Sequence, residues 1–230
     1  MVMEMKENYY SKSLNASRLL DVYQTGIDRV RRYLEAEIEF VKRHLDGVER
    51  VLELAAGYGR IMRELAPFAA SIVGVEFSKD SVLFGNEYLA PFHNCSFQTL
   101  DAHLIDFDSE FDVVLCLQNG LSAMKGDPRN LVERSIRALA RGGKAFFSTY
   151  SAKFWDHRLE WFKEQSDKGL LGEIDWENTK DGKIVCFDGF KATTFSEEDL
   201  DAFGILSGQP YRIEEVDESS LFLVVQKDGA

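Results

Sequence analysis

The chain has 230 residues, of which 45% are hydrophobic, so it is long and apolar enough for a sizeable α/β core and is not a disordered protein. Its net charge of −12 disfavours a nucleic-acid partner, and no apolar run reaches the roughly 18 residues that a membrane-spanning helix needs. The amino-terminal sequence lacks the basic region and apolar core of a signal peptide, so we expect a cytoplasmic protein with no membrane partner, acting as a monomer or homodimer.

The cysteines and histidines give no sign of a metal centre or a disulfide. Cys95, Cys116 and Cys186 are far apart and odd in number, and the four histidines lack the spacing of metal ligands. We therefore expect reduced, buried thiols and no bound metal.

Residues 1–48 are charged and carry an amphipathic helical pattern. Apolar residues recur at steps of three and four from Leu19 to Leu45, with a break predicted near Thr25 and Gly26. We expect a helical N-terminal cap over residues 1–48. Ahead of these helices, the tyrosine pair at positions 9 and 10 would either close over a ligand as a lid or pack as ordinary aromatic side chains.

Apolar segments with the character of buried strands then alternate with helical segments. The strands are expected at residues 51–55, 71–76, 95–100, 111–117 and 144–150. The helices are expected at about 58–68, 78–89 and 127–143, with Ser78 as an N-cap and a glycine pair ending the third. This alternation predicts a parallel sheet with helices on both faces.

The last third of the chain departs from the alternation. Residues 196–203 are expected to be helical, and strands are expected at 211–216 and 221–226. Residues 151–192 are rich in aromatic side chains and are expected to form an insertion over the carboxyl ends of the strands, as a substrate cage or as a small satellite core. The sequence thus predicts a single α/β domain over residues 1–230. Its core would be a Rossmann-like, doubly wound, mostly parallel seven-stranded sheet with an antiparallel edge strand.

The first predicted strand ends in a glycine-rich loop, LELAAGYGR, over residues 52–60. Glycines let the backbone turn sharply and approach a ligand, and many nucleotide-binding proteins use such a loop. A dinucleotide-binding loop needs a small residue where this chain has Arg60, and Glu53 disfavours a pyrophosphate but suits a ligand with an ammonium and a sulfonium. Glu76 ends the next strand, where a carboxylate can accept hydrogen bonds from both ribose hydroxyls.

In this order, several segments resemble the motifs of class I S-adenosylmethionine-dependent methyltransferases. The resemblance covers about residues 51–150 and, more loosely, the last two strands. LELAAGYG resembles the first motif, with Ala55 in place of the commoner glycine, and VGVEFS resembles the second. LDAHL is similar to the adenine-contacting segment, FDVVLCLQNG to the fourth motif and GGKAFFSTY to the fifth strand.

The resemblance implies that S-adenosylmethionine is the cofactor and assigns a part of it to each matching residue. Arg60 would either contact the cofactor carboxylate or lie on the helix surface. The remaining residues are expected around the methionine part (Glu53, Ala55, Gly57, Gly59), the ribose and adenine (Glu76, Phe77, Asp101, Ala102) and the methyl group (Leu117, Gln118).

The implied reaction is in-line attack of a substrate nucleophile on the sulfonium methyl group, so the protein chiefly positions the reactants and excludes water. A general base is needed only for a nucleophile that begins protonated. Asn119 is the candidate for orienting the acceptor, and Tyr150 and His157 are candidate bases. The Asn-Pro-Pro-Tyr signature of enzymes that methylate nucleic-acid amines is missing, since residues 118–121 read QNGL. We expect a small-molecule acceptor with a nitrogen or oxygen nucleophile.

Two other classes of function stay open. A nicotinamide-dependent oxidoreductase is opposed by Glu53 and Arg60 in the loop. A non-catalytic S-adenosylmethionine-binding protein on the same fold would bind the cofactor without transferring its methyl group.

Overall fold

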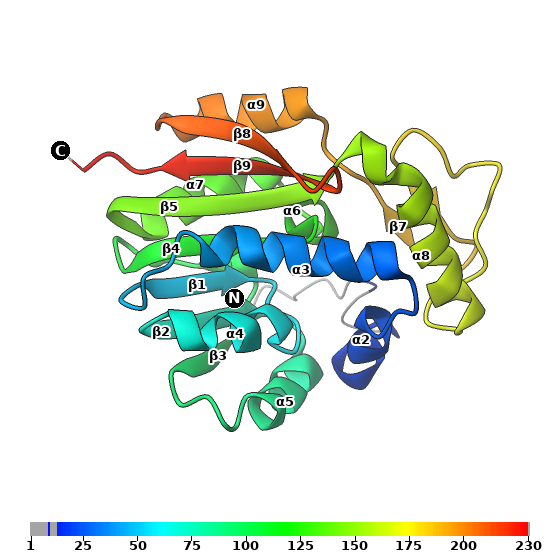
Figure 1. The fold of residues 1–230 in the computed structure, drawn as a ribbon, viewed down its shortest axis with the longest axis horizontal. Helices are drawn as coiled ribbons and strands as arrows, with labels where there is room; N and C mark the ends of the chain where they lie inside the picture. Colours follow the sequence, from blue (N-terminus) through cyan, green and yellow to red (C-terminus); the bar gives the residue numbers. More distant parts are fainter. Residues whose placement is uncertain (1–8, 10–12, 230) are drawn as a thin grey trace, which may run out of the picture.

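The computed structural model describes Tyr9 and residues 13–229 (Figure 1). Within these residues, seven strands form one sheet in the order β3-β2-β1-β4-β5-β9-β8. Strands β1 to β5 pair in parallel, and β9 runs antiparallel to both β5 and β8. The predicted Rossmann-like sheet is therefore confirmed. The strand bounds are Arg50–Leu54 (β1), Ser71–Glu76 (β2), Cys95–Thr99 (β3), Phe111–Cys116 (β4), Leu139–Tyr150 (β5), Tyr211–Val216 (β8) and Ser220–Gln226 (β9).

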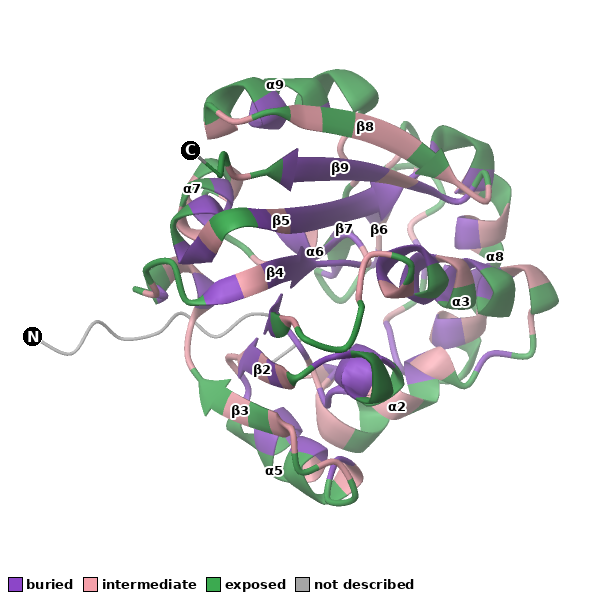
Figure 2. Ribbon diagram, turned by 60° about the vertical axis from the view of Figure 1, so that its left-hand side comes forward, coloured by how far each residue is buried: buried purple, intermediate pink, exposed green. Residues whose placement is uncertain are grey.

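Helices cover both faces of the sheet, and each face has its own apolar core. Helices α3 (Asp28–Lys42) and α4 (Arg60–Leu65) pack on one face, where Val41 and Met62 are fully buried. Helices α7 (Pro128–Ala138) and α9 (Glu197–Ser207) pack on the other. Strands β1, β4 and β9 and the second half of β5 are buried on both sides, as Figure 2 shows for β9, which explains their continuous apolar runs. The edge strands β3 and β8 are partly exposed.

A third apolar cluster lies beyond the carboxyl ends of the parallel strands, where Figure 1 shows α2 and α8 past the arrowhead of β5. It joins the amino-terminal helices to residues 151–192. The elements that build it are α2 (Ala16–Tyr23), η3 (Ala152–Phe154), α8 (Trp155–Asp167), β6 (Ile184–Val185) and β7 (Lys191–Ala192). The predicted helix break is present between α2 and α3, where Glu164 Oε1 accepts from the main-chain N–H of Gly26 at 3.1 Å.

The structure corrects the expected end of α7. This helix stops at Ala138, and the strand β5 begins at once with Leu139, so the pair Gly142–Gly143 lies inside a strand. A Cβ on Gly143 would stand 2.8 Å from the carbonyl oxygen of Asp112, so the glycine serves close strand approach. The other helices keep their predicted places: Ser78 caps α5 (Lys79–Tyr88), and the helix after β1 continues as η1 (Ala66–Phe68).

The sequence did not predict the short helix α6 (Gly120–Ala123). In the part of the chain that is described, no helix combines the length and apolarity needed to cross a membrane. Among the same residues, no group of three or more histidine, cysteine or acidic side chains is arranged to hold a metal ion. The thiols of Cys95, Cys116 and Cys186 are free, and the last two are buried.

Candidate functional site

A cavity of about 760 Å³ opens at the carboxyl ends of the central strands, between them and the third apolar cluster. One wall comes from the residues that follow β1, β2, β3 and β4. The opposite wall comes from α2 and the insertion. Eleven residues were predicted as cofactor contacts, and the structure brings ten of them to this cavity: Glu53, Ala55, Gly57, Arg60, Glu76, Phe77, Asp101, Ala102, Leu117 and Gln118.

The glycine-rich loop owes its shape to left-handed backbone at three positions. Ala55, Gly57 and Gly59 have φ of 54°, 56° and 83°. At Ala55 this conformation costs roughly 1–2 kcal/mol that a glycine would not. Gly59 is the eleventh predicted contact and does not line the cavity. A Cβ there would lie 2.7 Å from Leu89 Cδ1, so Gly59 lets α4 begin close to its neighbours.

Glu53 and Arg60 both line the part of the cavity where the sequence predicts the methionine end of the cofactor. Glu53 is only 4% exposed, and its Oε2 has no hydrogen-bond partner among the described residues. Burial raises the pKa of Glu53 to about 8, against the opposing charge of Arg60. Arg60 lines the cavity with its guanidinium 4.6 Å from the ring centre of Tyr23, and its Nε and one terminal nitrogen are also buried and, in the described part of the chain, unpaired. Arg60 therefore lines the cavity, and its contact with the cofactor carboxylate stays a prediction.

The carboxylate of Glu76 is held in one orientation by main-chain donors. Its Oε2 accepts from the N–H of Gly57 at 2.9 Å, and its Oε1 accepts from the N–H of Ser78 at 2.7 Å. Burial raises the pKa of Glu76, and main-chain hydrogen bonds from Ser78, Gly57 and Phe77 oppose the rise. A carboxylate has about four lone-pair sites, so Glu76 can still accept hydrogen bonds from a ligand.

Asp101 caps the short helix η2 (Ala102–Leu104) beside the loop after β2. Its Oδ1 accepts from the N–H of His103 at 2.9 Å and lies 2.9 Å from His103 Nδ1. Oδ2 has no recorded partner within residues 13–229, so it is the oxygen that faces outward from this pair. Phe77 and Ala102 add apolar surface to the same end of the cavity.

Aromatic side chains from the cap and the insertion close the opposite wall. Trp161, Phe162 and Phe190 pack in the third apolar cluster and also line the cavity, so the insertion forms a satellite core and its use as a substrate cage stays a prediction. Gln165 adds a buried amide to this wall. The sequence predicted an aromatic insertion over the strand ends but did not single out these residues, because their contact with the strand ends depends on how α8 folds back.

Tyr9 and Tyr150 also line the cavity. The hydroxyl of Tyr9 donates to Asp188 at 2.6 Å and its ring packs against Phe190, so Tyr9 packs as an aromatic side chain and its role as a lid stays a prediction. Tyr10 lies outside the described residues. Burial raises the pKa of Tyr150 to about 12, so its phenol is protonated at neutral pH and is a hydrogen-bond donor rather than a base.

The other two candidate catalytic residues do not reach the cavity wall. The amide of Asn119 donates to the Thr193 carbonyl at 2.7 Å and accepts from Thr149 Oγ1 at 2.9 Å, so both ends of it hold the fold together. His157 is about half exposed on α8, with Glu160 3.8 Å from its Nδ1. Neither side chain is placed to contact a ligand in the cavity.

Comparisons with known proteins agree with this geometry. A family model described as a methyltransferase domain matches residues 51–143. A ubiquinone biosynthesis O-methyltransferase of Idiomarina loihiensis is 26% identical over 192 residues, covering 73% of this chain and 78% of that protein.

Solved structures share the fold. A protein of Pyrococcus horikoshii superposes with a TM-score of 0.66 at 20% identity, covering 96% of this chain and 99% of its own. The 1,6-didemethyltoxoflavin-N1-methyltransferase of Burkholderia thailandensis, solved with 1,6-didemethyltoxoflavin and S-adenosylhomocysteine, gives a TM-score of 0.64 at 14% identity and covers 93% and 87%.

Proposed function

This chain belongs to the class I S-adenosylmethionine-dependent methyltransferase family, and we propose that it moves the methyl group to a nitrogen or oxygen atom of a small molecule. S-adenosylmethionine is the methyl donor. The proposal concerns the acceptor, the residues that hold both reactants and the geometry of transfer.

The pairing of Glu53 with Arg60 is the observation that carries the assignment of the site. One oxygen of Glu53 and two nitrogens of Arg60 are buried without a hydrogen-bond partner among the described residues, which is unfavourable unless a ligand supplies the partners. The methionine part of the donor carries one ammonium and one carboxylate. We therefore assign the ammonium to Glu53 and the carboxylate to Arg60, with Ala55 and Gly57 giving main-chain contacts.

The ribose and adenine fit the next part of the wall. Glu76, fixed by two main-chain donors, would accept both ribose hydroxyls with its remaining lone pairs. Asp101 Oδ2 would accept from the adenine amino group, with Phe77 and Ala102 against the ring. Leu117 and Gln118 would lie beside the methyl group, and Gly59 would act through the fold alone.

When bound, the donor supplies a methyl group that is already activated by its positive sulfur. The protein then has to align the nucleophile with that methyl group and exclude water. The aromatic wall of Trp161, Phe162 and Phe190 supports this role, because it covers the strand ends with apolar surface. Tyr150, a protonated phenol, would orient an acceptor by donating a hydrogen bond.

A small acceptor is supported by the names of similar proteins. One relative is a ubiquinone biosynthesis O-methyltransferase, and one protein of similar fold is a 1,6-didemethyltoxoflavin-N1-methyltransferase. The net charge of −12 opposes a nucleic-acid acceptor. We also propose that the chain acts as a single domain in the cytoplasm, as a monomer or homodimer without a membrane partner.

A labelled-methyl screen tests the proposal. The protein is incubated with methyl-labelled S-adenosylmethionine and a metabolite extract, and small-molecule products are separated and identified. Label in a small nitrogen- or oxygen-methylated product is expected. Label transferred to nucleic acid would contradict the acceptor class, and donor binding without any transfer would favour a non-catalytic binding protein.

A further inference from the structure

The turn that follows β4 holds two consecutive non-glycine residues in left-handed backbone. Gln118 has φ of 53° and Asn119 has φ of 62°. L-amino acids rarely adopt this conformation, and a pair of them persists only where surrounding contacts over-determine it. Leu117 and Gln118 of this turn line the cavity, so its shape sets the floor of the site.

Hydrogen bonds from separate elements hold the turn. The N–H of Gln118 donates to Ser148 Oγ of β5 at 2.7 Å and to Glu37 Oε2 of α3 at 3.2 Å. The N–H of Asn119 donates to the carbonyl of Ser148 at 3.1 Å. The amide of Asn119 adds its bonds to Thr149 and Thr193.

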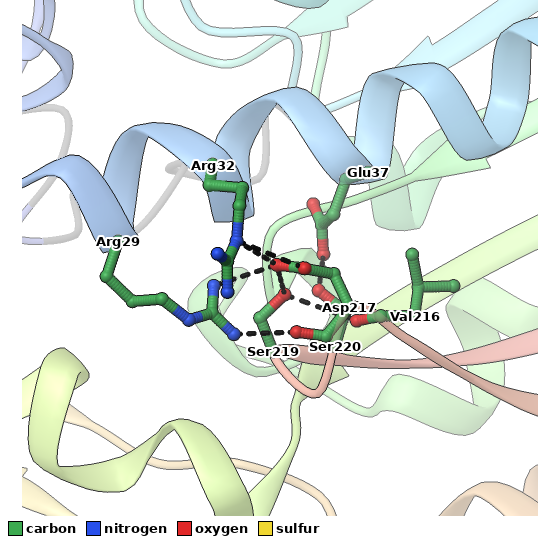
Figure 3. Close-up of polar contacts among 7 residues, drawn as sticks. All are labelled: Arg29, Arg32, Glu37, Val216, Asp217, Ser219 and Ser220. Carbon is green, nitrogen blue, oxygen red and sulfur yellow. Dashed lines mark hydrogen bonds and ion pairs between the residues drawn. The ribbon is translucent and has the colours of Figure 1, made fainter.

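Glu37 reaches this turn from helix α3, which is itself fixed to the turn between β8 and β9. Its Oε1 accepts from Ser220 Oγ at 2.7 Å (Figure 3). On the same helix, Arg29 Nη1 lies 2.8 Å and Arg32 Nε 3.2 Å from the carboxylate of Asp217, in the turn between β8 and β9. Helix α3 therefore cannot shift relative to β9 without breaking these contacts.

Burying the carboxyl group of Glu37 carries a desolvation penalty. The residue is 1% exposed, and burial raises its pKa to about 7 against hydrogen bonds from Ser220, Ser148 and Gln118. The charged or titratable side chains that face it are Arg60, Tyr23, Tyr33 and Tyr150. An apolar side chain of similar size would fill this space without the desolvation penalty, so stability alone does not account for the carboxyl group.

We propose that Glu37 is a positioning residue for methyl transfer. Its carboxyl oxygen accepts the N–H of Gln118 and so holds the left-handed turn that forms the floor beside the transferred methyl group. The inference rests on the proposed function of the cavity. Glu37 does not line the cavity, and it acts through the main chain of Gln118.

A pair of variants separates positioning from simple packing. Glu37→Gln keeps an oxygen for the Gln118 N–H and an amide that can donate to Ser220, whereas Glu37→Met keeps only the length. We expect kcat within about threefold of wild type for Glu37→Gln and a loss on the order of 10–100-fold for Glu37→Met. The Kd for S-adenosylhomocysteine should stay within about threefold in both. Ser220→Ala, which removes the other bond of the carboxylate, is the matched control and should keep kcat.

Wild-type kcat in Glu37→Met, or an equal loss in Glu37→Gln, would overturn the proposal. If circular dichroism shows that Glu37→Met does not fold, Glu37→Asp takes its place, because the shorter side chain withdraws the carboxyl oxygen from the N–H of Gln118. Wild-type kcat in Glu37→Asp would then overturn the proposal.

The rate of amide hydrogen exchange at Gln118 reports on the hydrogen bond between its N–H and Glu37 and needs no methyl transfer. Protection in wild type and Glu37→Gln with loss in Glu37→Met is expected, and equal protection in all three contradicts the proposal. If wild type transfers no methyl group, the proposed function fails while this exchange result still decides the role of Glu37.

Discussion

Replacing Glu76 by glutamine should weaken donor binding through the ribose hydroxyls. The carboxylate accepts Gly57 N–H and Ser78 N–H with separate oxygens, so each oxygen is left to accept one hydroxyl. Glutamine replaces one oxygen with an NH₂ group that faces a main-chain N–H and cannot accept. The loss of one hydrogen bond to a charged group, about 1.5–3 kcal/mol, corresponds to a Kd roughly 10–150-fold higher.

Isothermal titration calorimetry with S-adenosylhomocysteine measures this difference. Glu35→Gln, at an exposed position on α3, is the matched control and should bind as wild type does. An analogue lacking both ribose hydroxyls separates ribose contact from loop distortion. This analogue should bind the wild-type protein weakly. Its Kd for Glu76→Gln should be about the same as for wild type, because an analogue without the hydroxyls cannot make the contact with Glu76. A Kd for Glu76→Gln within twofold of wild type for the complete ligand would refute the ribose assignment.

Three further predictions follow from the same geometry. The pKa of Glu53 is raised to about 8, so the affinity for the ammonium-bearing ligand should rise as pH increases from 6 to 8, by at most tenfold per pH unit. Glu53→Gln should flatten this pH dependence when binding is measured by calorimetry. A flat pH profile for the wild-type protein would count against the assignment of the ammonium to Glu53. Gly74→Ala should lower the free energy of unfolding by about 1–3 kcal/mol, because its Cβ would stand 2.5 Å from Met62 Sδ. The control Gly229→Ala places its Cβ in open space and should leave the melting temperature unchanged. An equal effect of both variants on thermal unfolding would refute the packing argument. His157→Ala should leave kcat unchanged between pH 6 and 8, because the ring is about half exposed and does not line the cavity. If the variant lost the pH dependence of kcat that the wild type shows, His157 would again be a candidate base.

The strand-end half of the site was predictable because its residues follow one another in the chain. Glu53, Gly57 and Glu76 belong to short motifs that end neighbouring strands, and parallel strands bring their carboxyl ends to one edge. The parallel pairing of the first five strands followed from the same alternation of strands and helices. Local signals of this kind are readable from the sequence because the backbone geometry that they require is local.

The remaining half depends on contacts between distant segments. The pattern after β4 suggested that Asn119 would meet the acceptor, but its amide bonds to Thr193, 74 residues further on. The end of α7 was misplaced because Gly142–Gly143 is typical of a helix end, whereas pairing with the last strand extends β5 through it. Glu37 gave no signal, since an acidic residue on an amphipathic helix ordinarily faces solvent.

Binding of S-adenosylhomocysteine and NAD to the wild-type protein, compared by calorimetry, tests the central claim most directly. The account predicts a stoichiometric complex with S-adenosylhomocysteine and no heat of binding with NAD. Because the cavity wall offers Glu53 and Arg60 to a zwitterionic ligand end, the Glu53→Gln variant should bind S-adenosylhomocysteine more weakly at pH 8. Binding of NAD without binding of S-adenosylhomocysteine would contradict the account.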